Sequence, residues 1–168
     1  MVGRQAEGGH PPRTGVGRVR RRRGRRGPAL ILYLDTSALV KLYVREERSG
    51  LVRARVAAAR LVSTSRVAYP EARAALARRH REGGLGASGL RRARASLERD
   101  LRALVLVELD EILAREAGEL AERYALRGLD AIHLASALGL GRLLGATPAF
   151  LAFDEQLSAA ARAEGLAG

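Results

Sequence analysis

The sequence predicts an α/β fold in which helices cover both faces of a mainly parallel sheet. Four short apolar stretches alternate with longer segments whose apolar residues recur at helical spacing. Strands separated by helices favour parallel pairing, because a helix can supply the crossover that parallel neighbours need. The 168 residues fit one domain plus a tail, and 47% apolar content is enough for a sizeable core.

The four predicted strands are short apolar runs. They lie at residues 29–34, 61–64, 103–109 and 149–153. The first run is uninterrupted up to Leu34, which is typical of a strand buried on both faces. We therefore expect residues 29–34 to lie inside the sheet.

Seven helices are predicted around these strands. They cover residues 38–44, 46–60, 66–81, 88–101, 110–125, 128–140 and 155–164. Thr36 and Ser37 are candidate caps for the first of them. We expect Pro70 to break the third helix near its start, and the glycines at 83, 84 and 86 to form a turn before the fourth.

The net charge of +12 is unevenly distributed. Residues 1–28 hold nine arginines and one acid, whereas the remainder holds 21 basic and 17 acidic residues. This tail is rich in Gly, Pro and Arg without apolar periodicity, so it is predicted to be disordered. It is either a basic arm that contacts phosphates or the product of a translation start assigned too far upstream. The folded domain is expected at residues 29–168.

Several classes of protein are excluded or disfavoured by composition. With no cysteine there is no disulfide framework, zinc–thiolate site or cysteine nucleophile. Charges interrupt every long apolar run, and the tail lacks the apolar core of a signal peptide, so neither a membrane span nor secretion is expected. These features favour a cytoplasmic protein.

Four acidic residues lie at the edges of hydrophobic elements. Asp35 and Asp154 follow apolar strands, Glu71 begins an Ala/Leu-rich stretch, and Asp130 follows Gly128. The carboxyl ends of parallel strands meet at one edge, which is the usual ligand-binding crevice of such sheets. Carboxylates there suit a hard cation such as Mg²⁺ or Mn²⁺. Their mutual repulsion raises some pKa values until a cation binds.

Each acid also has a purely structural interpretation. A carboxylate is favourable near a helix N-terminus, so Asp35 and Glu71 could be first-turn or leading residues, and Asp130 could be an N-cap. Asp154 competes with Glu155 for the cap of the last helix. Singly these signals are weak, and it is their joint placement that favours a site.

The sequence carries none of the common motifs of other enzyme classes. The three histidines form no ligand set, and His133, one helical turn from Asp130, is interpreted as a satisfied, partly buried side chain. No nucleophile elbow, phosphate-binding loop or complete dinucleotide fingerprint is present. Thr36-Ser37 after Asp35 replaces the Asp-x-Asp pair of haloacid-type phosphatases, which disfavours that acidic-pocket alternative.

Four ordered segments resemble the motifs of PIN-domain nucleases, especially VapC-type toxins. They are LDTSALVK at 34–41, TS at 64–65 followed by EARAAL at 71–76, LRGLDAIHLA at 126–135, and FDEQL at 153–157. The resemblance covers residue 31 to about residue 166. It implies a three-layer α/β/α fold whose acids converge on one or two Mg²⁺ or Mn²⁺ ions, with RNA as substrate.

The same resemblance implies residue roles and partners. Asp35 and Asp130 are the principal metal ligands, Glu71 and Asp154 complete the catalytic pocket directly or through water, and Ser37 helps to order it. A cognate antitoxin would cover the pocket with its C-terminal segment, and relatives are usually homodimers. In two places the chain departs from its relatives: Ala152 stands where many have Ser or Thr, and Gly168 ends the chain where many continue into a final strand.

The leading hypothesis is thus a metal-dependent endoribonuclease that acts as the toxin of a toxin–antitoxin pair. The alternatives are a PIN-domain nuclease of RNA maturation and a catalytically silent module that binds nucleic acid or protein. Arginines 73, 78, 79 and 81 are candidate contacts to the RNA backbone, although a solvated helix face also explains most of them.

Overall fold

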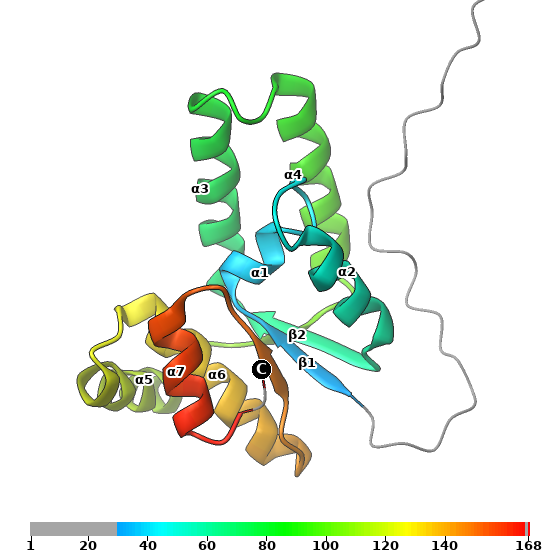
Figure 1. Ribbon diagram of the computed structural model, residues 1–168. Coiled ribbons are helices and arrows are strands. Elements are labelled where there is room, and N and C mark those ends of the chain that lie inside the picture. The colour runs from blue at the N-terminus through cyan, green and yellow to red at the C-terminus, as the bar shows by residue number, and fades with distance from the viewer. Residues whose placement is uncertain (1–29, 167) are drawn as a thin grey trace, which may run out of the picture.

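A four-stranded parallel sheet forms the centre of the computed structural model, which describes residues 30–166 and 168 (Figure 1). The predicted tail, residues 1–28, lies outside the described residues. The strands are β1 (Ile31–Leu34), β2 (Leu61–Ser65), β3 (Val105–Val107) and β4 (Ala149–Leu151). Their order is β3-β2-β1-β4, so β1 and β2 are the inner strands.

Pairing in the sheet brings distant parts of the chain together. Leu32 in β1 pairs with Val62 of β2 on one side and with Ala149 of β4 on the other. All three pairings are parallel, so the four strands end at the same edge. The predicted parallel sheet is therefore confirmed.

Helices cover both faces of this sheet, as predicted. One layer contains α1 (Thr36–Val40), α2 (Ser49–Ala58), α3 (Ala68–Arg81) and α4 (Ala87–Leu101). The other contains α5 (Glu111–Tyr124), α6 (Gly128–Leu144) and α7 (Glu155–Ala163). Figure 1 shows the first layer in blue to green and the second in yellow-green to red. The result is the three-layer α/β/α arrangement.

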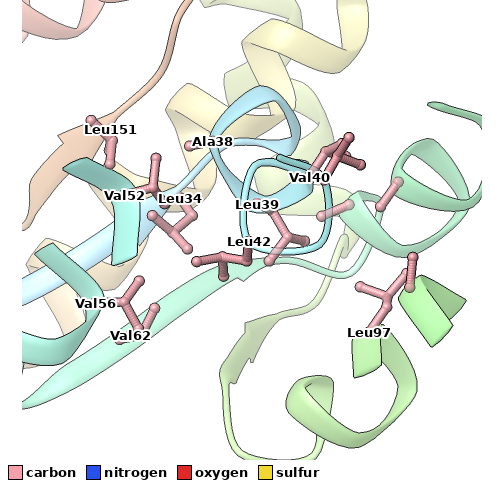
Figure 2. Close-up of a cluster of buried hydrophobic side chains, with 14 of the residues drawn as sticks. Leu34, Ala38, Leu39, Val40, Leu42, Val52, Val56, Val62, Leu97 and Leu151 are labelled. Carbon is pink, nitrogen blue, oxygen red and sulfur yellow. The ribbon is translucent and has the colours of Figure 1, made fainter. Parts of the chain in front are cut away.

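Alternation along β1 explains why there are two cores. Leu32 and Leu34 point into one core with α1 to α4, whereas Tyr33 points into the other with α5 to α7. In the first core Leu34, Leu39 and Val52 have no solvent exposure (Figure 2). In the second, Tyr33 stacks on Phe150 with 5.5 Å between ring centroids. Parallel strands buried on both faces are typically near-continuous apolar runs, which is the pattern seen in β1, whereas the other inner strand, β2, buries Ser63, Thr64 and Ser65.

Several predicted boundaries were wrong for local reasons. The first helix starts at Thr36 because Asp35, rather than Thr36 or Ser37, caps it. The second starts at Ser49 because Arg48 adopts a left-handed conformation (φ 64°) that interrupts the helix. Pro70 does not break α3, since it lies in the first turn, where no intrahelical N–H bond is lost.

The other differences concern the ends of elements. The third strand is only Val105–Val107, shorter than the predicted 103–109, and it lies at an edge of the sheet. The sixth helix continues past residue 140 to Leu144 and ends at Gly145, whose φ of 60° suits glycine. Within the described residues, none of the helices combines the length and the apolar character that a membrane crossing requires.

Candidate active site at the carboxyl edge of the sheet

All four predicted acids lie at the starts of helices. Asp35, directly after β1, is the N-cap of α1, and Asp154 is the N-cap of α7. Glu71 and Asp130 lie in the first turns of α3 and α6. Because the backbone N–H groups of a first turn carry partial positive charge, each position favours a carboxylate.

Asp35 is nearly buried (4% exposed), and hydrogen bonds fix the position of its side chain. Its Oδ1 accepts hydrogen bonds from the backbone N of Ala38 and from Oγ of Ser37, both at 2.8 Å. Ser37 in turn accepts a bond from the backbone N of Phe153 at 3.0 Å. One hydroxyl thus joins Asp35 to the segment that carries Asp154.

Glu71 is bound by two side chains from other elements. Thr36 donates to Oε2 of Glu71 at 2.6 Å, and Nε2 of His133 lies 3.0 Å from the same oxygen. Nε2 of His133 is also 3.0 Å from Oγ1 of Thr36. These contacts join α1, α3 and α6 at one point, so the start of each helix is fixed relative to the others.

The tautomer of His133 follows from its partners. Glu71 can only accept when ionised, so Nε2 of the imidazole carries the hydrogen. Nδ1 lies 3.0 Å from the hydroxyl of Tyr33, and burial raises the pKa of that phenol far above its usual range. In the tautomer with its hydrogen on Nε2, Nδ1 is the acceptor and the neutral phenol of Tyr33 is the donor. The chain from Tyr33 through His133 to Glu71 fixes the orientation of the carboxylate.

Asp130 and Asp154 complete the group electrostatically. Burial is the largest cause that raises the pKa of Asp130, and the charges of Asp154 and Glu71 raise it further. The charge of Arg127 acts in the opposite direction. Three carboxylates from α3, α6 and α7 therefore act on one another at the carboxyl edge of the sheet.

The other two carboxylates respond differently to burial. Burial raises the pKa of Asp35, and the hydrogen bonds from Ala38 and Ser37 and the nearby His133 offset this only in part. Burial also acts to raise the pKa of Glu71, but the hydrogen bonds from His133 and Thr36 outweigh it and hold that pKa below its ordinary value. Glu71 is thus ionised more readily than an ordinary glutamate, whereas Asp35 and Asp130 are ionised less readily than ordinary aspartates.

The donor set fits a hard divalent cation that keeps part of its water shell. The hydrogen bonds from the backbone N of Ala38 and from Oγ of Ser37 both go to Oδ1 of Asp35, so neither of them occupies Oδ2. Among the described residues, no three His, Cys, Asp or Glu side chains are grouped closely enough to hold an ion by themselves. Mg²⁺ typically binds through only one or two carboxylates plus water and substrate phosphate, so such a group is not required.

Sequence reasoning missed two contributions to this site and described another in part. Asp35 and Asp154 do cap helices, each accepting a backbone N–H bond at 2.8 Å, so the capping interpretation describes one oxygen of each. Asp130 is not an N-cap, because Arg127 has that position. Thr36 and His133 bind Glu71, whereas the sequence suggested a cap and a merely satisfied histidine. The one helical turn between Asp130 and His133 was the available sequence signal that His133 lies near the pocket.

Sequence comparison assigns this arrangement to a known class. Residues 32–163 match the family described as PIN domain. Ribonuclease VapC45 of Mycobacterium tuberculosis (strain CDC 1551 / Oshkosh) is 44% identical over 111 residues, which are 66% of this chain and 77% of the relative. Ribonuclease VapC46 of Mycobacterium tuberculosis (strain ATCC 25618 / H37Rv) is 37% identical over 136 residues, 81% of this chain and 94% of the relative.

A solved structure shares the fold. The crystal structure of Mycobacterium tuberculosis VapC20, described as a Sarcin-Ricin loop cleaving toxin, superposes with a TM-score of 0.59 at 24% identity and covers 77% of this chain and 94% of its own. The chain therefore belongs to the PIN-domain family and, within it, to the VapC ribonucleases.

Proposed function

We propose that this protein is a metal-dependent endoribonuclease that hydrolyses RNA phosphodiester bonds and acts as the toxin of a toxin–antitoxin pair. The observation that carries the proposal is that Asp35, Glu71, Asp130 and Asp154 all lie at the starts of helices, with Asp35 and Asp154 following strands of the sheet and the charges of Glu71 and Asp154 both acting on Asp130. The kinship with VapC ribonucleases supports the substrate class.

Asp35 and Asp130 would be the principal ligands of a Mg²⁺ or Mn²⁺ ion, with Glu71 and Asp154 contributing directly or through water. A divalent ion in such a site polarises a phosphodiester oxygen, lowers the pKa of a water molecule and stabilises the leaving oxygen. Other side chains of the protein orient these carboxylates. Thr36 and His133 hold Glu71, and Ser37 holds Asp35.

The hydroxyl groups beside the pocket are already engaged. Thr36 donates its hydrogen to Glu71, and Ser37 donates to Asp35 while it accepts from Phe153. Both hydroxyl groups are thus used to position carboxylates of the pocket. This pattern supports attack by water, with the four carboxylates as the catalytic groups.

The proposed partners follow from the same kinship. VapC20, the structural relative, is described as a toxin. We propose a cognate antitoxin whose C-terminal segment lies over the acidic pocket and keeps the enzyme inactive. We also propose that the protein is a cytoplasmic homodimer.

Two substitutions test the proposed function. Asp35→Asn and Asp130→Asn keep side-chain shape and, at Asp35, capping ability, but they remove charge that a hard cation requires. We expect both variants to fold. Mg²⁺-dependent RNA cleavage should fall by about 100-fold or more, which is the size of effect seen when one group that stabilises transition-state charge is removed. Growth inhibition should be lost as well. Cleavage of labelled RNA and thermal melts measure the two properties separately.

Asp110→Asn is the matched control. Asp110 caps α5 through a 2.8 Å bond from the N of Leu113, the same bond that Asp35 makes to Ala38, but it lies outside the pocket contacts described above. This variant should cleave normally. Full activity in folded Asp35→Asn would contradict the metal site. RNA binding without cleavage at any Mg²⁺ or Mn²⁺ concentration would favour the silent module, and cleavage without growth inhibition would favour a nuclease of RNA maturation.

A further inference from the structure

Charge is distributed very differently over the two halves of the domain. Residues 29–102, which include the α1 to α4 layer, hold 16 Lys and Arg against seven Asp and Glu. Residues 103–168, which include the α5 to α7 layer, hold five against ten. A general excess of arginine would not deplete acids on one side only. The asymmetry is therefore a property of this surface and not of overall composition.

Just over half of the excess basic charge of the first half lies on the helical hairpin formed by α3, the turn at residues 82–86, and α4. Residues 68–102, which also include Arg102 just after α4, hold nine arginines and four acids, a net charge of +5 out of the +9 of residues 29–102. Figure 1 shows this hairpin extending away from the sheet and the rest of the domain. A projecting hairpin exposes its charged side chains more fully than a helix packed along the sheet.

Four of the arginines near the hairpin's tip are exposed and form no ion pair within the described residues. Arg73, Arg79 and Arg99 form ion pairs with Glu98, Glu46 and Asp100. In the described part of the chain, no ion pair is formed by the exposed side chains of Arg78, Arg81, Arg91 and Arg92. Their charge is free to act on a ligand outside the domain.

This surface is continuous with the acidic pocket, because α3 carries residues of both. Glu71 lies in the first turn of α3 and Arg78 lies seven residues further, which is two turns along the same face of the helix. At 1.5 Å per residue the separation along the axis is about 10 Å. Arg81 ends α3, and Arg91 and Arg92 lie in the second turn of α4, close to the hairpin's tip.

We propose that the α3–α4 hairpin binds the phosphate backbone of the RNA substrate through Arg78, Arg81, Arg91 and Arg92, and so leads the strand into the pocket at Glu71. This inference rests on the proposed function. An acidic pocket by itself repels a polyanion, so the binding energy must come from a neighbouring basic surface. Guanidinium groups suit phosphate oxygens, and the opposite layer, with its excess of acids, would repel the strand.

The test uses the full chain in the Asp35→Asn background, so that RNA binding is measured without cleavage. Two double variants change the hairpin, Arg78→Gln/Arg81→Gln and Arg91→Gln/Arg92→Gln. Each of them, and the quadruple variant that combines them, is compared with the control double variant Arg60→Gln/Arg162→Gln. Arg60 and Arg162 are exposed, have no ion pair in the described residues, and lie off the hairpin. The control therefore removes the same charge, and residues 1–28 are present in every variant.

We expect the hairpin variants to flatten the plot of log binding constant against log salt. The slope should fall by about 0.7 for each phosphate of a single strand that the protein no longer neutralises. In the catalytically competent chain, KM should rise while kcat stays near the wild-type value, because uniform binding is lost. The control pair should behave as the wild type.

Three results would overturn the proposal. Equal salt slopes in hairpin and control variants would place the phosphate-binding residues elsewhere. A fall in kcat at constant KM would assign the arginines to another role. Unchanged RNA binding, combined with failure to bind a purified antitoxin, would make the hairpin a protein-binding surface. If the wild type bound RNA through the hairpin but did not cut it, the proposed function would fail and this inference would stand.

Discussion

Asp35 shows how one side chain can serve the fold and the chemistry together. Its Oδ1 accepts hydrogen bonds from the backbone N of Ala38 and from the hydroxyl of Ser37 at the start of α1, and neither bond occupies Oδ2. The position is costly for a charged group, since the side chain is nearly buried and its pKa is raised. An N-cap alone would be better placed at the surface, where a carboxylate keeps its hydration.

Asp35→Asn should therefore stabilise the metal-free protein at neutral pH. A pKa raised in the folded state means that ionised Asp35 destabilises the fold, by about 1.4 kcal/mol for each unit of the rise. This cost is absent below the unfolded pKa of about 3.9 and is complete once the pH exceeds the folded pKa. Asparagine keeps the acceptor oxygen and removes the charge.

Thermal melts of the metal-free protein across pH check this expectation. The melting temperature of Asp35→Asn should exceed that of the wild type at pH 7, by about 2–4 °C for each kcal/mol in a domain of this size, and the difference should disappear near pH 3.5. Asp110→Asn, for which capping is the only described role, should show little change at either pH. A lower melting temperature for Asp35→Asn at pH 7 would contradict the expectation that the buried charge of Asp35 destabilises the metal-free fold.

At the scale of elements, Ser37 joins two helices that are remote in sequence. It lies in the first turn of α1, and its hydroxyl accepts the backbone N–H of Phe153, one residue before the N-cap of α7. Ser37 thus supplies a hydrogen bond to the backbone directly beside Asp154.

Ser37→Ala should loosen this connection. We expect a loss of stability of about 0.5–1.5 kcal/mol for each hydrogen bond removed, together with weaker RNA cleavage, because Asp35 and Asp154 lose their common anchor. Chemical denaturation and cleavage rates of the same preparation measure the two effects.

Ser49→Ala provides the comparison, because Ser49 has the same bonding pattern away from the pocket. Its hydroxyl donates to the carbonyl of Val44 at 2.9 Å and accepts from the N of Glu46 at 3.1 Å. The two variants should lose similar stability, and only Ser37→Ala should lose activity. Equal activity in both would reduce Ser37 to a structural residue.

Sequence patterns predicted the elements better than the interactions between them. The uninterrupted apolar run before Asp35 correctly indicated a buried strand, because a strand covered on both faces has no polar side. The start of α2 could not be predicted, since a left-handed Arg48 has no sequence signal comparable to glycine. The bond between His133 and Glu71 joins residues 62 positions apart, and a single sequence carries no information on such pairs.

At the scale of the whole molecule, the described domain contains every residue assigned to the site. The nine arginines of residues 1–28 add charge without adding a carboxylate ligand to the four named. A protein that starts at Ala29 should therefore retain metal-dependent RNA cleavage. Its RNA binding should weaken and show a shallower salt dependence, because arginines that can bind phosphates are removed.

Cleavage assays at moderate salt with the full chain and the shortened chain decide this point. Weaker binding alone is consistent with the expectation. Loss of cleavage by the shortened chain, while its melting curve is unchanged, would make residues 1–28 part of the catalytic unit.

The strand order has a consequence for how the enzyme is made. β1, near the start of the domain, is completed by β4, near its end, through the pairing of Leu32 with Ala149. During synthesis, β4 and Asp154 leave the ribosome after the other three strands, so the nascent chain cannot close its pocket until β4 has emerged. A ribonuclease built in this order holds no finished catalytic centre during the earlier part of its own translation, close to the message that encodes it.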